Sequence, residues 1–215
     1  MHICHWQNMK QKKQMRIRKI LMLWGLFFAQ MLAAQNVEER FEVELSQKSR
    51  TIKNIICDFT QTRSMSVLAE DIVKRGKFTY LRPGNILLSF DDGDYIKMTD
   101  LRFTMQSAGV HTDIKVNSNP VLKELRKILS ACMTGDIEAM SSGFSMKVAE
   151  NKDFYEVMLI PLKGRGSVRM KHIFMVFDKL HMSLVTLCLT ELSGDGFRYD
   201  FTNKKFDTEL PADLF

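Results

Sequence analysis

Few side chains in this sequence have the types and spacing that catalysis or metal binding requires. The three histidines after residue 34 lack the spaced partners of a metal site: His111, His172 and His181. The sequence also lacks the P-loop, GxGxxG, HExxH and GxSxG motifs. We therefore predict that the protein is not an enzyme and uses no metal or other cofactor. A Ser, His and Asp set that converges only in space is the alternative.

An acidic run between two apolar segments has the ligand chemistry of a calcium loop. Asp91, Asp92 and Asp94 form this run, which is shorter than a calcium loop. Gly93 within it is the residue that a tight hairpin turn requires. We predict a turn rather than a calcium site.

Arg82 is the charged residue whose position is most informative. It precedes Pro83 at a predicted strand end, between two apolar segments. A guanidinium there can bridge to backbone carbonyls at the end of a lid helix and so set how easily the lid opens. A solvated turn arginine is the alternative.

Apolar side chains offer a different chemistry, the binding of an apolar ligand. Ten methionines and thirteen phenylalanines follow Ala34, and methionine repacks readily around ligands of different shape. This composition suits a cavity for acyl chains, with an ordinary core filled by methionine as the alternative. The predicted cavity residues are Phe78, Tyr80, Ile86, Leu88, Phe90, Met98, Leu122, Leu125, Leu129, Met158 and Met175.

The first 34 residues are typical of an export signal. A basic stretch leads into an apolar run from Ile20 to Leu32, which ends at Ala33-Ala34 and is short for a membrane span. We predict cleavage after Ala34, with an uncleaved anchor as the alternative. All six charges of this leader are positive, so 25 of the 31 Lys and Arg residues remain against 25 Asp and Glu. The mature part is formally neutral, which gives no support to nucleic-acid binding.

Three cysteines lie in the mature part, namely Cys57, Cys132 and Cys188. Their odd number and the absence of CxxC spacing argue against a disulfide framework. We predict three small buried apolar side chains, while the pairing of two of them stays open.

The pattern of apolar residues predicts two helices among many short strands. An amphipathic helix is expected between Val37 and Lys53, and a second follows Pro120 and ends at Gly135. Turn signals separate the strands closely enough for antiparallel hairpins. The predicted strands cover residues 77–81, 85–90, 95–98, 101–105, 144–149, 154–162, 167–177, 183–192 and 196–201.

This order of elements predicts a mainly β fold with an α lid. We expect an incomplete, half-open antiparallel β-barrel of about ten strands that is covered by helices. A closed barrel has no need of an amphipathic helix at mid-chain, whereas an open one needs a lid over its apolar trough. Residues 35–215 are expected to form this one domain.

Several motifs in this order resemble the LolA family of periplasmic lipoprotein carriers, especially its Bacteroidetes-type members. The resemblance covers nearly all of the mature part. Its motifs are Phe59-Thr60-Gln61, Gly76 to Gly84, Asp94-Tyr95, the helix ending at Gly135, Glu191 to Gly196, Tyr199 to Asn203, and Leu210 to Phe215.

The resemblance implies a hydrophobic cavity for acyl chains and a location in the periplasm. Arg82 matches the family arginine that holds the lid and governs cargo release, with Pro83 beside it, and Ile86 matches a large apolar residue at cavity and partner contacts. The implied cargo is an acylated lipoprotein or a lipid, which an inner-membrane ATP-driven exporter supplies for transfer to an outer-membrane acceptor that the sequence does not identify.

The segment from Phe103 to Asp113 departs from the proteobacterial members. The resemblance also allows a carrier of a glycolipid or another acyl compound as an alternative. The same fold would serve a non-catalytic sensor of envelope lipids or lipoproteins, which is a further alternative.

Overall fold

The computed structural model describes residues 37–115, 120–162 and 170–215, with only the backbone described for 120–125 and Met140. The predicted leader and its cleavage site lie outside these ranges. The strands are β1 (Asn54–Ser64), β2 (Ile72–Leu81), β3 (Asn85–Phe90), β4 (Tyr95–Met98), β5 (Arg102–Ser107), β6 (Val110–Lys115), β7 (Phe144–Glu150), β8 (Phe154–Pro161), β9 (Met170–Asp178), β10 (Ser183–Glu191) and β11 (Gly196–Phe206).

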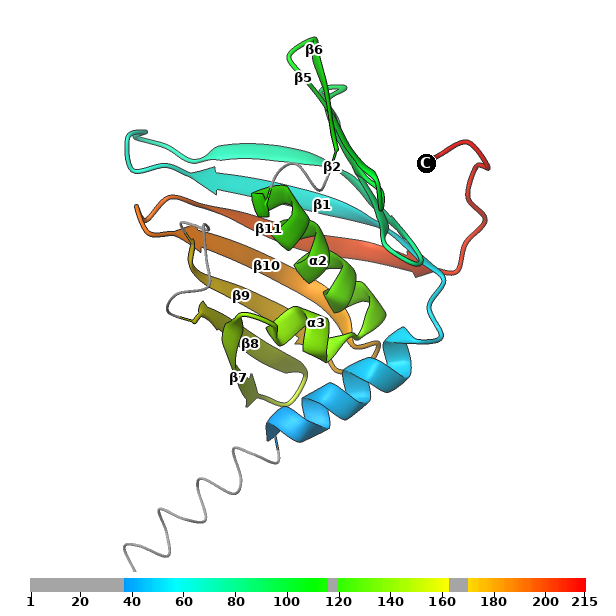
Figure 1. Ribbon diagram of the computed structural model, residues 1–215, viewed down its shortest axis with the longest axis vertical. Coiled ribbons are helices and arrows are strands. Elements are labelled where there is room, and N and C mark those ends of the chain that lie inside the picture. Colours follow the sequence, from blue (N-terminus) through cyan, green and yellow to red (C-terminus); the bar gives the residue numbers. More distant parts are fainter. Residues whose placement is uncertain (1–36, 116–119, 163–169) are drawn as a thin grey trace, which may run out of the picture.

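These strands form one antiparallel sheet of 11 strands in the order β6-β5-β4-β3-β2-β1-β11-β10-β9-β8-β7. Its edge strands β6 and β7 do not pair with each other, so the barrel is open. The sheet curves around helix α2 (Pro120–Thr134), and the strands from β3 to β6 turn away from the plane of the others (Figure 1). The predicted fold class, a half-open antiparallel barrel with a helical lid, is confirmed.

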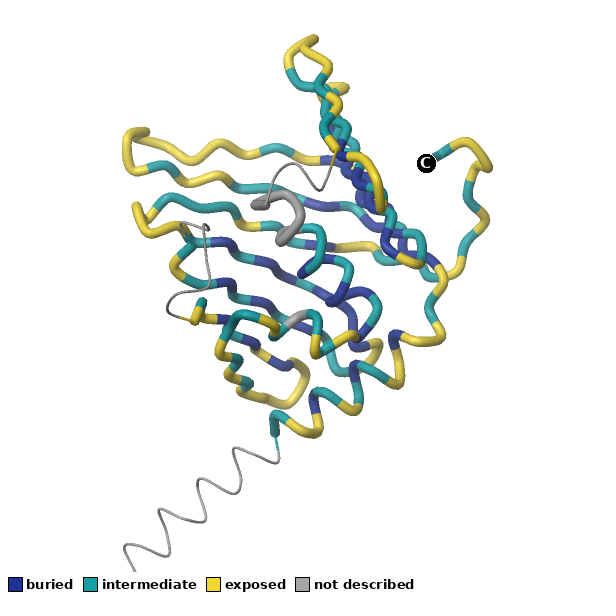
Figure 2. The backbone as a smooth tube through the Cα atoms, in the orientation of Figure 1, coloured by how far each residue is buried: buried dark blue, intermediate teal, exposed yellow. Residues whose placement is uncertain are grey.

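The strands bury one face because their apolar residues alternate with polar ones. Along β8, buried Tyr155, Val157 and Leu159 alternate with less buried residues. Each of the three pairs with a buried residue of β9, namely Phe177, Met175 and Ile173. Figure 2 shows the buried residues in the middle of the sheet and on α2. The core therefore lies on the concave side of the sheet, under α2.

A glycine allows β2 and β3 to approach closely. Gly76 pairs with Phe90, and a Cβ atom at Gly76 would lie 2.0 Å from the backbone oxygen of Ser89. Any other residue would force these two strands apart. Directly after Phe90, the acidic run forms a turn in which Gly93 has a φ of 89°. The predicted turn is confirmed.

Two helices meet at the end of α2. The helix over residues 37–49 packs Phe41 against Tyr155 and Phe177, with ring centroids 5.4 and 5.3 Å apart. Gly135 ends α2 with a φ of 71° and donates its N–H to the carbonyl of Ala131. A Cβ atom at Gly135 would lie 2.7 Å from the carbonyl oxygen of Leu45, so α2 contacts the first helix through backbone.

The structure adds three elements to those predicted. Strand β1 contains a short alternation of Ile55, Cys57 and Phe59, but its second half turns polar side chains inward. Strand β6 is an exposed edge strand without apolar alternation. The short helix α3 (Ile137–Ser141) begins at Asp136, whose side chain accepts a hydrogen bond from the N–H of Ala139.

No helix among the described residues is long and apolar enough to cross a membrane. Within the same residues, no disulfide joins Cys57, Cys132 and Cys188. Burial raises the pKa of the Cys57 and Cys132 thiols to about 12. The prediction of small buried apolar side chains holds for these two, while Cys188 is only half-buried.

Candidate ligand cavity

An apolar cavity of about 290 Å³ lies between the concave face of the sheet and α2. Its lining residues come from strands on both sides of the centre of the sheet. These strands can face one cavity because the sheet is curved. The lining residues are Gln61, Phe78, Leu88, Ile96, Met98, Phe103, Ile128, Leu129, Phe144, Met170, Ile173, Leu187, Leu189, Glu191, Phe197, Tyr199 and Phe201.

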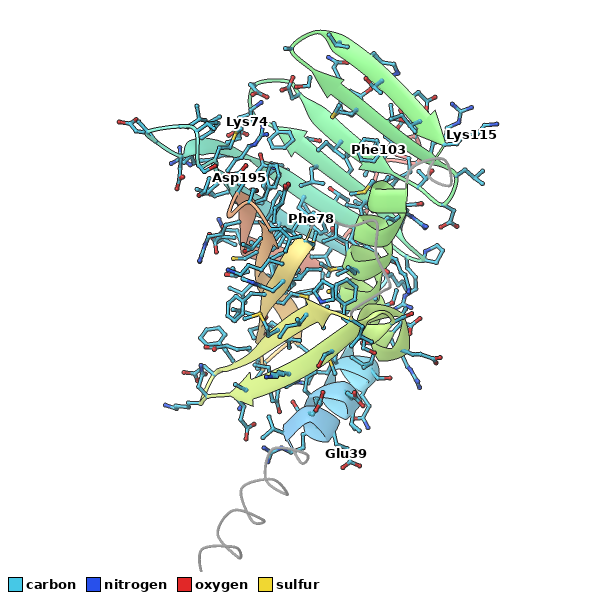
Figure 3. All side chains as sticks on the ribbon, turned by 60° about the vertical axis from the view of Figure 1, so that its left-hand side comes forward. Glu39, Lys74, Phe78, Phe103, Lys115 and Asp195 are labelled. Atoms are coloured by element: carbon cyan, nitrogen blue, oxygen red, sulfur yellow. The ribbon has the colours of Figure 1, made fainter. Side chains whose placement is uncertain are left out.

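Cross-strand pairs place one wall of this cavity. Phe78 of β2 pairs with Leu88 of β3, and Leu88 pairs with Ile96 of β4. Met98 pairs with Phe103 in the same way. Because paired residues share a face, these side chains all point toward α2, and Figure 3 shows Phe78 and Phe103 on the side of the sheet that faces the helix.

The opposite wall and the cover are equally apolar. Leu187 and Leu189 of β10 pair with Tyr199 and Phe197 of β11. Helix α2 contributes Ile128 and Leu129, which are 2% and 6% exposed. These adjacent residues both contact the cavity because α2 lies directly over it. The lid predicted at mid-chain is therefore the cover of the cavity.

One end of the cavity is polar and open. Glu191 is exposed there, and Gln61 and Tyr199 are half-buried. The Nε2 of Gln61 donates a hydrogen bond to the Tyr199 Oη at 2.6 Å. Burial raises the pKa of Tyr199 although the hydrogen bond from Gln61 lowers it, so the phenol is neutral at physiological pH. We call this end the mouth.

Four predicted cavity residues line the cavity: Phe78, Leu88, Met98 and Leu129. The side chains of Leu122 and Leu125 lie outside the described part of the chain. Four others are buried in the core but do not line the cavity: Tyr80, Ile86, Phe90 and Met175. Ile86 is fully buried, so the surface contact with a partner that the resemblance implied is not available to it in this conformation.

The prediction that Met158 lines the cavity is wrong. Met158 is out of phase with Tyr155, Val157 and Leu159 on β8 and so lies on the other face of the strand. The prediction relied on residue type alone, whereas the alternation of the strand decides which face a side chain takes.

Sequence reasoning missed most of the wall that β10 and β11 supply. The signal was present as two alternations, Leu187 with Leu189 and Phe197, Tyr199 and Phe201. The position of Gln61 at the mouth was also not predicted, because residues 54–64 were not expected to form a strand. Gln61 pairs with Tyr199 across β1 and β11.

Arg82 lies beside the end of the first helix. Its Nε donates to the carbonyl of Ile52 at 3.0 Å, and its Nη2 donates to the carbonyl of Ser49. Ser49 is the last residue of the helix over 37–49. The guanidinium therefore binds the carbonyl of the last helical residue, which also accepts from the Ile52 N–H, and a second carbonyl just beyond the helix. This helix is the first one, however, and not the helix that covers the cavity.

The neighbouring Pro83 contacts the covering helix instead. Its carbonyl accepts a hydrogen bond from the Oγ of Ser130 in α2 at 3.3 Å. A Cβ atom at Gly84 would lie 2.9 Å from the same Oγ and 3.1 Å from the Arg126 Nη2. Arg126 in turn forms an ion pair with Asp100 in the β4–β5 turn. The β2–β3 turn thus holds both helices, and we call residues 82–84 the latch.

No protein-family model and no curated protein matches this sequence. Solved structures similar to it include a DUF1329 family protein from Desulfovibrio piger, with 10% identity over 81% of this chain and 95% of that chain (TM-score 0.43). A LolA superfamily protein from Nitrosomonas europaea has 10% identity over 78% and 93% (TM-score 0.36).

A third similar structure is the MucA/MucB complex of Pseudomonas aeruginosa, with 12% identity over 81% of this chain but 58% of that chain (TM-score 0.44). All three TM-scores lie below 0.5. These likenesses therefore assign neither a cargo nor a partner to this chain. An inference about its ligand has to rest on the geometry of its own cavity.

The arrangement suits reversible burial of an apolar group. The inner part of the cavity offers only apolar side chains, while polar atoms gather at the mouth. Within the described residues, no group of three or more His, Cys, Asp or Glu side chains converges as metal ligands do. A ligand with a long apolar part and a polar end would fit, with the apolar part inside and the polar end at the mouth.

Proposed function

We propose that this protein is a carrier that binds the acyl chain of a lipid or lipidated protein in the cavity under α2. The observation that supports this most directly is the lining of the cavity, which is apolar along its length and polar only at the mouth. Water inside such a cavity would find few hydrogen-bond partners. An acyl chain needs none, and it leaves its polar end where Glu191, Gln61 and Tyr199 lie.

Burial alone can supply the affinity. Each buried methylene contributes about 0.8 kcal/mol. About ten methylenes then give roughly 8 kcal/mol, the free energy of a Kd near 1 μM. No covalent step is required, and release needs only that the chain find an equally apolar environment elsewhere. The protein is accordingly proposed to act without catalysis.

The volume of the cavity requires α2 to move for a larger cargo. At about 290 Å³ the cavity lies at the lower end of the ~300–1,000 Å³ range of ligand pockets. Cargo with more than one acyl chain would need more space than the closed form offers. The latch contacts, from Arg82 to the first helix and from Ser130 to Pro83, then oppose this opening. Bound cargo and a closed latch compete, which makes binding reversible.

We further propose a place for this carrier in the cell envelope. The predicted export signal and the resemblance to LolA-type carriers support a periplasmic location and a lipoprotein or lipid cargo. The cargo would come from an inner-membrane ATP-driven exporter and pass to the outer membrane. An external energy source is needed because the sequence has no nucleotide-binding motif.

A cavity-filling variant tests the proposal. Ile96 is half-buried and lines the cavity, so Ile96→Trp should occupy space that an acyl chain would use. Ile160 is exposed and does not line the cavity, and Ile160→Trp is the matched control. The measurement is displacement of a fluorescent acyl probe from delipidated protein.

We expect Ile96→Trp to weaken probe binding at least about tenfold, equivalent to losing about two methylenes of burial. Ile160→Trp should bind as the wild type does. Equal binding by all three proteins would place the acyl chain elsewhere, and absence of binding by the wild type would contradict the carrier function itself.

A further inference from the structure

The polar pair at the mouth has hydrogen-bonding capacity that the described protein does not use. Gln61 and Tyr199 pair across β1 and β11, and the bond between their side chains is the one described hydrogen bond of either side chain. If the Gln61 amide donates to the phenol, the phenol proton has no acceptor among the described residues. If the amide is turned round, the phenol donates to the amide oxygen, and the NH₂ group is then the one without an acceptor among the described residues. In both orientations the pair keeps a donor.

This donor is held in a fixed place and faces the concave side. Tyr199 is two residues from Phe201 on the same face of β11, and the two rings stack with centroids 6.4 Å apart and an interplanar angle of 10°. The ring centroid of Phe59, which lies on the same face of the neighbouring strand β1, is 6.2 Å from that of Tyr199. An aromatic ring packed in this way cannot easily swing out to solvent. The hydroxyl therefore stays at the boundary between the apolar cavity and the mouth.

The surroundings decide which ligand group this donor suits. Leu187 pairs with Tyr199, and Phe197 lies two residues away, so the hydroxyl borders an apolar wall. At the open mouth water can accept from this donor, and a ligand acceptor would take the place of that water. An acyl chain entering from the mouth carries its carbonyl oxygen at the junction between its apolar part and its headgroup.

We propose that Tyr199 and Gln61 form a subsite that binds the carbonyl oxygen of an acyl ester or amide. This inference rests on the proposed function and deepens it, because it adds a specificity for acyl compounds over other apolar molecules of similar length. The subsite also fixes the direction of the ligand, with the headgroup at Glu191 and the chain running under α2. Glu191, exposed at the mouth, accepts hydrogen bonds from hydroxyl or amide groups of the headgroup.

Probes that differ in one carbonyl test the subsite. Methyl palmitate and N-methylpalmitamide carry the carbonyl, and hexadecyl methyl ether lacks it at similar length. Each is titrated against delipidated full-length protein carrying a fluorescent apolar probe, and the displacement constant is measured. The ester and amide arms distinguish an ester-linked glycerolipid chain from an amide-linked chain of a lipidated amino terminus.

The variant is Tyr199→Phe, which removes only the hydroxyl. Its matched control is Tyr155→Phe, because the Tyr155 hydroxyl donates to Glu44 and does not line the cavity. We expect the wild type and Tyr155→Phe to bind at least one carbonyl probe about five- to tenfold more tightly than the ether. Because Tyr199→Phe leaves the NH₂ group of Gln61 free to donate, the double variant Tyr199→Phe/Gln61→Leu should lose this preference while binding the ether as before.

Two results would overturn the subsite and leave the carrier function standing. One is a wild type that binds ester, amide and ether equally. The other is a preference that survives when both Tyr199→Phe and Gln61→Leu are present. If the wild type binds none of the three probes, the carrier function itself fails and the subsite with it. Thermal unfolding of Tyr199→Phe shows whether the variant is folded, and Gln61→Leu provides a second variant at the same subsite.

Discussion

Arg82 and Ser49 connect the β2–β3 turn to the last residue of the first helix, since the guanidinium donates to the Ser49 carbonyl. The next residue in the turn, Pro83, accepts a hydrogen bond from α2. One turn of the sheet therefore contacts both helices, and the cover of the cavity is tied to the first helix through it.

Replacing Arg82 should shift the protein toward its open, loaded form. Arg82→Leu removes two hydrogen bonds from a charged group, one to the carbonyl of Ser49 at the helix end and one to that of Ile52 beyond it, each worth about 1.5–3 kcal/mol. If the closed form alone makes these bonds, their loss should raise the apparent affinity for acyl cargo about tenfold or more and lower the stability of the empty protein. Probe displacement and thermal unfolding measure the two effects.

The control for this variant is Arg75→Leu, because Arg75 is exposed on β2, the strand that leads into the turn of Arg82. It should change neither affinity nor stability appreciably. An Arg82→Leu protein with wild-type affinity and reduced stability would show that the residue supports the fold without controlling the lid.

Gly135 should be intolerant of any side chain. Gly135→Ala combines an unfavourable φ of 71° with a Cβ atom 2.7 Å from the Leu45 carbonyl oxygen. Gly143 has a φ of 88° with nothing within 4 Å of its Cβ position, so Gly143→Ala carries the backbone cost alone. We expect Gly135→Ala to lose at least about 2 kcal/mol more than Gly143→Ala in urea unfolding. Equal losses would mean that the two helices separate at no cost.

Alkylation of two buried thiols can report lid opening. Cys132 lies on α2 with its Sγ 3.2 Å from the Met175 Sδ, while Cys57 lies in the sheet. The pKa of each is raised to about 12 by burial, so both should react slowly with iodoacetamide at neutral pH. In Arg82→Leu we expect Cys132 to react several times faster and Cys57 at the wild-type rate, as measured by mass spectrometry of labelled peptides. Parallel acceleration at both sites would indicate global unfolding instead.

Acid should destabilise the protein partly through Asp178. Burial alone would raise the pKa of this carboxyl, but hydrogen bonds from Ser183 and the His181 N–H, with Lys204 nearby, lower it overall. A carboxyl with a lowered pKa in the folded state adds stability above its unfolded pKa of about 3.9. That stability is lost as the pH falls through the folded pKa.

Asp178→Asn should therefore be less stable than the wild type at neutral pH, and the difference should shrink below about pH 4. Thermal unfolding across this pH range measures it. Other carboxyls with lowered pKa values, such as Asp94 and Asp200, keep part of the acid sensitivity in the variant. A constant difference at every pH would assign the effect of the substitution to packing rather than to the carboxylate charge.

The sequence predicted the fold better than the cavity. Turn signals and alternation located the hairpins, and Pro120 and Gly135 located α2, because these are local properties of the chain. Strand β6 was missed because an exposed edge strand needs no apolar alternation. Met158 was assigned to the cavity by residue type, although the phase of β8 puts it on the other face.

The cavity wall itself depends on which strands become neighbours. Gln61 and Tyr199 are far apart in the sequence, and only the pairing of β1 with β11 brings them together. Arg82 was expected at a helix end and is found there, but its helix is the first one rather than the covering one. Long-range pairing of this kind leaves no local signal in a single sequence.

The central claim is that the cavity carries an acyl chain, and native mass spectrometry of protein purified from the cell envelope without detergent tests it most directly. The wild type and Arg82→Leu are compared. The account predicts an acylated molecule bound to the protein, with higher occupancy in Arg82→Leu. Protein that is empty in both forms under gentle ionisation would contradict it.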